Sequence, residues 1–160
     1  KIEDFTNGSL FHRVLWDDAE KGSSSTGLAK DKNIRRVVMC SGKVYFDLLE
    51  ERDARGLNDI YLLRFEQFYP FPAMSALKEL ERFQNAEMVW CQEEPKNQGA
   101  WSFMEPNIEW VLSRMKAKFK RPIYVGRPAS ASPATGLASQ HKEQQKLLVE
   151  EALNLKENKK

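Results

Sequence analysis

Short apolar segments alternate with longer amphipathic segments along most of the chain, and this alternation restricts the possible folds more than any other feature. The apolar segments have the composition of buried strands and span residues 37–40, 60–65, 88–91 and 123–125. Strands separated by helices form βαβ units, in which consecutive strands run parallel and helices cover both faces of the sheet. The sequence therefore predicts an α/β fold, a three-layer α/β/α sandwich with a mainly parallel sheet.

The segments between these strands carry apolar side chains at helical spacing. The predicted helices are residues 43–55, residues 75–83, a long helix with the stripe Ile108, Val111, Leu112 and Met115, and residues 137–155. In the first helix, Arg52 falls among the charged side chains of the exposed face, and Gly56 is expected to end the helix.

Two helices also predict which side chains are buried. In the last helix, the side chains expected to face inward are Leu147, Leu148, Ala152 and Leu155. Trp101, Phe103 and Trp110 put three aromatic rings into ten residues, more than one helix face normally buries. We therefore expect Trp110 in the core, and either Trp101 or Phe103 covered by another domain or subunit.

The first 33 residues differ from the rest of the chain. Residues 11–16 have the composition of a short edge strand, which would be the fifth strand of the sheet, whereas residues 21–32 are rich in Gly, Ser and Lys and predict a mobile loop. The predicted organisation is a connecting segment over 1–33, an α/β domain over 34–155 and a tail over 156–160. Because the chain begins with Lys1 rather than Met, we expect it to be a piece of a longer protein.

The balance of charge excludes some classes of partner. Lys and Arg number 25 against 23 Asp and Glu, which leaves a net charge of +2, so we expect no nucleic-acid binding driven by bulk charge. The sequence has no run of about 18 apolar residues, so we expect no membrane span. The two cysteines, Cys40 and Cys91, end buried strands, suit a reducing compartment and are expected to be inert thiols.

Loops at the carboxyl ends of parallel strands are where sheets of this kind bind ligands. Four segments fall there, at residues 40–43, 66–71, 92–99 and 126–136. The first, Cys-Ser-Gly-Lys, is either a phosphate cradle at a helix start or a tight turn with a solvated lysine, and it lacks the spacing of a P-loop. In the last segment, Arg127 either fixes a phosphate or carboxylate or belongs to a stiff surface connector.

No catalytic arrangement is visible in the sequence. Glu93 and Glu94 are adjacent, so in an extended segment they point to opposite sides and cannot act as a dyad. His12 and His141 are far apart and no Cys-x-x-Cys is present, so we expect no zinc site. The thiamine-diphosphate signature, Gly-Asp-Gly followed by an Asn, is also absent.

Four segments, taken together, resemble one known family. They are SGKVYFDLLEER (41–52), RFEQFYPFP (64–72), QEEPKNQGAW (92–101) and GRPASASPATG (126–136). In this order they closely resemble the C-terminal domain of 2-oxoglutarate dehydrogenase, and the resemblance runs from about Phe11 to Leu153. It is closer to bacterial than to mitochondrial members, and it implies a transketolase C-terminal-type sandwich with one strand antiparallel to the others.

The resemblance implies the activity of a parent enzyme. Members of the family bind thiamine diphosphate and Mg²⁺, oxidatively decarboxylate 2-oxoglutarate in the tricarboxylic acid cycle, and succinylate lipoyl groups on a dihydrolipoyl succinyltransferase core. Their cofactor and catalytic groups lie in two preceding domains. This chain alone is therefore expected to be inactive and to hold no cofactor, and its expected role is to support assembly with those domains in a homodimer.

Two further expectations concern the cellular location of the protein and an alternative function. The resemblance implies a cytoplasmic enzyme in a bacterium, or an enzyme of the mitochondrial matrix in a eukaryote. The alternative function is that of a free-standing small-molecule-binding or nucleotide-binding α/β protein. The reading frame upstream of Lys1 distinguishes the two, because only the family reading requires several hundred further residues with a thiamine-diphosphate motif.

The resemblance also implies an allosteric site for acetyl-CoA or a nucleotide at one edge of the sheet. Lys43, Arg64 and Gln67 match the family positions associated with this site. Ala73 and Met74 stand where regulated members have arginines, and their absence removes charge-assisted contacts to a phosphate.

The cations of this edge have two possible arrangements. Lys43 and Arg64 are expected near each other at the ends of adjacent strands, where an anion between them would relieve their repulsion. Alternation along the strand also puts Glu66 on the same side as Arg64, so the alternative is a direct pair between Glu66 and Arg64.

Overall fold

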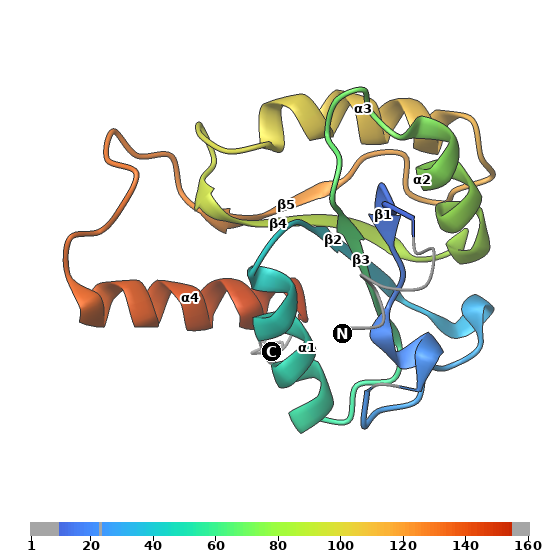
Figure 1. Ribbon diagram of the computed structural model, residues 1–160, viewed down its shortest axis with the longest axis horizontal. Helices are drawn as coiled ribbons and strands as arrows, with labels where there is room; N and C mark the ends of the chain where they lie inside the picture. Colours follow the sequence, from blue (N-terminus) through green and yellow to red (C-terminus); the bar gives the residue numbers. More distant parts are fainter. Residues whose placement is uncertain (1–9, 23, 155–160) are drawn as a thin grey trace.

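The computed structural model describes residues 10–22 and 24–154, and over these residues the chain forms three layers (Figure 1). The strands are β1 (Val14–Leu15), β2 (Arg36–Cys40), β3 (Ile60–Phe65), β4 (Glu87–Pro95) and β5 (Ile123–Arg127). In the described part of the chain they form one sheet in the order β1-β3-β2-β4-β5. β2 to β5 are parallel, whereas β1 pairs antiparallel with β3 at one edge. The predicted α/β fold and its mainly parallel sheet are confirmed.

Helices cover both faces of the sheet. As Figure 1 shows, α1 (Val44–Ala54) and α4 (Ala138–Ala152) pack on one face, and α2 (Ala73–Leu80) and α3 (Trp101–Ser113) pack on the other. Short 3-10 helices span Asp18–Lys21, Asp31–Asn33 and Glu81–Phe83. None of the helices in the described residues is long and apolar enough to cross a membrane.

The central strand β2 supplies side chains to two separate cores. Val37 and Met39 point into the core under α2 and α3, whereas Val38 and Cys40 point into the core under α1 and α4. This division follows from the pleat of a strand, which sends successive side chains to opposite faces. A strand buried on both faces needs a continuous apolar run, and this is why the sequence pattern located β2.

The edge strand predicted within residues 11–16 is present but shorter. β1 spans Val14–Leu15, with Val14 opposite Phe65. The pairing extends a little further because the Arg13 carbonyl accepts hydrogen bonds from the backbone N–H groups after β3, whereas Phe11 is exposed. The domain boundary at residue 34 and the mobility of residues 21–32 stay predictions.

Strand β4 is longer than the apolar pattern indicates. The predicted loop over 92–99 begins only after Pro95, because the polar residues that follow Cys91 continue the strand. This polar end stays in the sheet since β5 runs beside it, with Cys91 opposite Val125 and Pro95 opposite Arg127. Strand propensity depends strongly on such neighbours, and a single segment does not reveal them.

The prediction that Arg52 lies on the exposed face of α1 is wrong. Its side chain is fully buried and forms a salt bridge with Asp17, which is fully buried too. Asp17 accepts a second hydrogen bond from the Leu62 backbone N–H at 2.7 Å, and Arg52 donates to the Ile60 carbonyl at 3.3 Å. These partners compensate for the desolvation of both charges.

The predicted inward faces of the last two helices also need correction. In α4 the buried side chains include Val149, whereas Leu147 is 45% exposed; Leu155 lies outside the described residues. In α3, Trp110 is 43% exposed and its ring packs against the guanidinium of Arg114, 3.4 Å from the ring centroid. Both errors have one cause, because a bulky apolar residue can lie next to the buried stripe without belonging to it.

The end of α4 is bound to the start of β2. Arg36 Nη1 donates to the carbonyls of Glu151 and Ala152, at 3.0 Å each, and Arg35 Nη2 donates to the Leu153 carbonyl at 3.3 Å. Arginines at this position satisfy carbonyls that a helix C-terminus leaves without intrahelical partners, and they complement the helix dipole.

Candidate functional site

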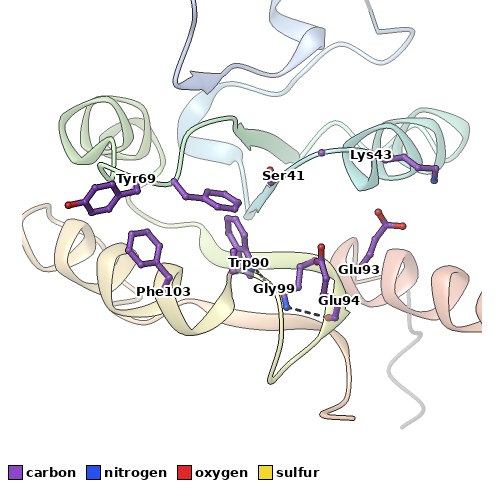
Figure 2. Close-up of a pocket in the computed structure, with 12 residues that line it drawn as sticks. Ser41, Lys43, Tyr69, Trp90, Glu93, Glu94, Gly99 and Phe103 are labelled. Atoms are coloured by element: carbon purple, nitrogen blue, oxygen red, sulfur yellow. Dashed lines mark hydrogen bonds between the residues drawn. The ribbon is translucent and has the colours of Figure 1, made fainter. Parts of the chain in front are cut away.

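The carboxyl ends of β2 and β4 border a cavity of about 460 Å³ (Figure 2). Its walls come from the turn before α1, the loop after β3, the end of β4 and the start of α3. The lining residues are Ser41, Gly42, Lys43, Phe68, Tyr69, Trp90, Gln92, Glu93, Glu94, Gly99, Ala100 and Phe103. The cavity lies at the edge of the sheet where parallel α/β folds bind ligands.

Trp90 forms the apolar floor of the cavity. The side chain is 1% exposed, and the rings of Phe65 and Phe68 pack against it with centroids 6.1 and 6.0 Å away. The indole Nε1 donates to Gln92 Oε1 at 2.9 Å, and Gln92 Nε2 donates to the Gln98 carbonyl at 2.8 Å. The amide of Gln92 is thus used to fix the turn after β4.

The two ends of the cavity differ in chemistry. Figure 2 shows the rings of Tyr69 and Phe103 at one end and the side chains of Glu93 and Glu94 at the other. Tyr69 is 83% exposed and Phe103 is 38% exposed. Within the described residues, neither Glu93 nor Glu94 forms a salt bridge or a side-chain hydrogen bond.

Lys43, predicted as a site residue, lies on the rim of the cavity. Its Nζ contacts the Asp47 carboxylate at 2.8 Å. The hydrogen bond to Asp47 raises the pKa of Lys43, and the negative charge of Glu93 acts in the same direction. The Lys43 ammonium group therefore stays charged and forms an ion pair with the Asp47 carboxylate.

Arg64 and Gln67, the other predicted site residues, do not line this cavity in the described part of the chain. The Arg64 guanidinium lies 4.7 Å from the centroid of the Tyr45 ring, and its Nε is 2.7 Å from Glu66 Oε1. Of the two arrangements left open above, the structure shows the pair between Glu66 and Arg64. Gln67 Nε2 donates to the Pro70 carbonyl at 2.7 Å. An allosteric role for Lys43, Arg64 and Gln67 stays a prediction.

The small-residue loop over 126–136 is bound to the turn after β4. Asn97 Nδ2 donates to the Ser130 carbonyl at 2.9 Å, and the Ser130 N–H donates back to Asn97 Oδ1 at 3.0 Å. Arg127 faces α4, where its Nη2 lies 3.1 Å from His141 Nδ1. These contacts favour the interpretation of this loop as a stiff surface connector.

Cys40 and Cys91 lie in the core under α1 and α4. Burial raises the pKa of the Cys40 thiol to about 12 and raises the pKa of Cys91 well above its ordinary value. Since the thiolate is the reactive form, we expect neither cysteine of the folded chain to react with a thiol reagent at pH 8. Both should react after unfolding in urea. Titration of thiols with and without urea measures this, and one rapid equivalent in the folded chain would contradict it.

Sequence reasoning predicted the edge of the sheet but missed the aromatic residues of the cavity. Tyr69, Trp90 and Phe103 come from three separate segments, and only the fold brings them together. The available signal was the density of aromatic residues in the loop after β3 and at the start of α3. The sequence predicts that either Trp101 or Phe103 is covered by another domain or subunit. In this chain Phe103 is 38% exposed and Trp101 is 6% exposed, and coverage by a partner stays a prediction.

The fold and the cavity together define an α/β/α domain with one antiparallel edge strand and a cavity at the carboxyl ends of its parallel strands. Among the described residues, no group of three or more His, Cys, Asp or Glu could hold a metal ion. The chain belongs to the family described as 2-oxoglutarate dehydrogenase C-terminal, which it matches over residues 1–153.

Similar curated proteins are named for the same dehydrogenase. The 2-oxoglutarate dehydrogenase E1 components of Brucella anthropi, Brucella ovis and Brucella abortus are each 58% identical to this chain over 153 residues, or 95% of its length. The chain spans 15% of the length of each of these relatives. The resemblance found in the sequence is confirmed, and a free-standing small-molecule-binding protein is not favoured.

Proposed function

We propose that this chain works as the C-terminal domain of an E1 component that oxidatively decarboxylates 2-oxoglutarate and transfers the succinyl group to lipoyl groups. The observation that supports this proposal is the 58% identity over 95% of the chain to relatives named as that component. The reaction belongs to the tricarboxylic acid cycle. We expect a cytoplasmic location in a bacterium and the mitochondrial matrix in a eukaryote.

The residues that the structure describes do not fit a site for thiamine diphosphate and Mg²⁺. The described residues offer no cluster of metal-binding side chains. At the cavity, the lysine that would meet a diphosphate is already bound to Asp47, and Glu93 and Glu94 would repel it. In the proposed enzyme these cofactors belong to other domains, and no chemical step is assigned to this one.

The proposed role of the domain is assembly. Its partners would be the preceding domains of the same enzyme, the second subunit of a homodimer and, through the complete enzyme, the dihydrolipoyl succinyltransferase core. Exposed aromatic side chains support such a role, because Tyr69, Phe103 and Trp110 leave large apolar surface in contact with water.

An activity assay tests whether catalysis requires domains other than this one. We expect the isolated chain to show no turnover of 2-oxoglutarate with thiamine diphosphate, Mg²⁺ and an artificial electron acceptor. The control is a longer chain that includes the segments preceding this domain in the relatives, which should turn over. Activity proportional to the concentration of the isolated chain, and retained after repurification, would overturn the proposal.

A further inference from the structure

The cavity at the ends of β2 and β4 has more negative than positive charge at its rim. Lys43 and Asp47 form a pair in which the two charges cancel. Glu93 and Glu94 add two further carboxylates that no other described residue neutralises through a salt bridge. A bound anion would therefore meet repulsion at this rim, whereas a cation would be attracted.

The remainder of the cavity suits an apolar side chain. Trp90 forms the floor, and Phe68 lines the wall. The indole N–H, the one polar group of the Trp90 side chain, already donates a hydrogen bond to Gln92. A volume of about 460 Å³ can hold an aromatic or large aliphatic side chain with part of its backbone. No unsatisfied polar group of the floor would be buried by such an occupant.

The rim has the composition of a protein interface. Tyr69 and Phe103 present rigid, half-exposed or fully exposed rings at one end of the cavity, and Figure 2 shows the glutamates at the opposite end. Aromatic residues around an apolar pocket are enriched at the centres of protein interfaces, and charged groups at the edge select the partner.

We propose that this cavity binds a basic polypeptide segment, in which one aromatic or large aliphatic side chain enters the pocket over Trp90 and flanking Lys or Arg side chains pair with Glu93 and Glu94. The site is a recognition surface on this domain and is independent of the decarboxylation proposed for the complete enzyme. Charge complementarity at the rim selects a basic segment over an acidic one.

The test follows the indole N–H of Trp90 by NMR in the folded chain. The probe is a capped peptide, Arg-Leu-Arg, with Glu-Leu-Glu and Arg-Gly-Arg as matched peptides. The indole signal is assigned with Trp→Phe variants at the other three tryptophans, Trp16, Trp101 and Trp110. We expect saturable displacement of this signal by Arg-Leu-Arg and at least about five-fold weaker binding of each matched peptide.

A variant without the two glutamate charges tests whether the peptide contacts Glu93 and Glu94. E93Q/E94Q should weaken Arg-Leu-Arg binding by about five-fold, the size expected for two partly exposed ion pairs. The matched control, E50Q/E143Q, removes the same charge from exposed positions that do not line the cavity and should leave the affinity unchanged. Both variants retain the pocket floor, and the NMR spectrum of each variant shows whether the fold is intact.

Four results would overturn the proposal. Three of them are equal binding of the acidic peptide, an affinity unchanged by E93Q/E94Q, and absence of saturation at millimolar Arg-Leu-Arg. The fourth comes from pyrophosphate as the opposing probe: if it shifted the Trp90 signal with higher affinity than the basic peptide, the cavity would be an anion site. None of these measurements depends on the activity of a complete enzyme, so their failure leaves the proposed function intact.

Discussion

Asp17→Ala is expected to lower the free energy of unfolding by about 3–5 kcal/mol, the cost of leaving one charge of a buried pair without its partner. Both Asp17 and Arg52 are fully buried, so water cannot replace the missing carboxylate. The change also removes the acceptor of the Leu62 backbone N–H, which lies 2.7 Å from Asp17 Oδ2. Equilibrium unfolding in urea gives the difference.

Further variants distinguish the contribution of the Asp17–Arg52 salt bridge from other effects of each substitution. Arg52→Met should destabilise the fold by a similar amount, whereas Asp17→Leu/Arg52→Met should cost less than the two single changes together, since it leaves no unpaired charge. The control is Glu51→Ala on the same helix, which breaks the exposed pair with Arg55 and should change stability by about 0.5 kcal/mol or less. A loss below about 1 kcal/mol for Asp17→Ala would show that the pair is not needed.

Trp90→Ala is expected to lower the free energy of unfolding by about 3–5 kcal/mol, because it opens a void in the centre of one core. The side chain is 1% exposed and packs against Phe65 and Phe68. Trp90→Phe keeps a ring but leaves Gln92 Oε1 without its donor, and should cost about 1–3 kcal/mol.

Trp110→Ala is the control for this series. It removes the same type of side chain from α3, where the ring is 43% exposed and contacts Arg114. Loss of an exposed cation–π contact is worth about 0.5–1 kcal/mol, so the variant should stay close to the parent in urea unfolding. Equal destabilisation by Trp90→Ala and Trp110→Ala would mean that the two rings are equally buried in solution.

The sequence predicted β2 and β3 closely because most of their residues are apolar and buried, as in strands that are covered on both faces. β3 spans the predicted residues 60–65, and β2 differs by one residue at its start. The predicted bounds of β4 and β1 differ more from the structure, because pairing with neighbouring strands determines where these two strands begin and end. β4 continues through polar residues because β5 runs beside it, and β1 depends on pairing with a strand about 50 residues later in the chain.

The burial of the charged residue Arg52 could not be predicted from the periodicity of apolar residues. Helical spacing classifies a residue by its own polarity, so Arg52 counted as exposed. Its burial depends on Asp17, 35 positions earlier, and no local pattern connects the two. The segment before the first parallel strand therefore holds the partner of a core residue, although its composition suggested a connecting segment.

The sequence predicted a ligand site at the carboxyl ends of the parallel strands, and the cavity described above lies at that edge of the sheet. Of the predicted site residues, Lys43 lines this cavity, whereas Arg64 and Gln67 do not. Arg64 is on the α1 side of the sheet, against Tyr45, because alternation in β3 turns it away from the cavity. The aromatic residues of the site depend on packing between three elements, which the sequence does not show.

The hydrogen bonds from Arg35 and Arg36 to the end of α4 have a consequence for folding during synthesis. A ribosome releases β2 long before it releases the carbonyls of residues 151–153 that these arginines bind. Until then, one face of the emerging sheet lacks α4, and Leu148 and Ala152 are not available to cover Val38 and Cys40. We therefore expect the nascent domain to complete its fold only after α4 has been made, and we expect its uncovered apolar face to attract chaperones during that interval.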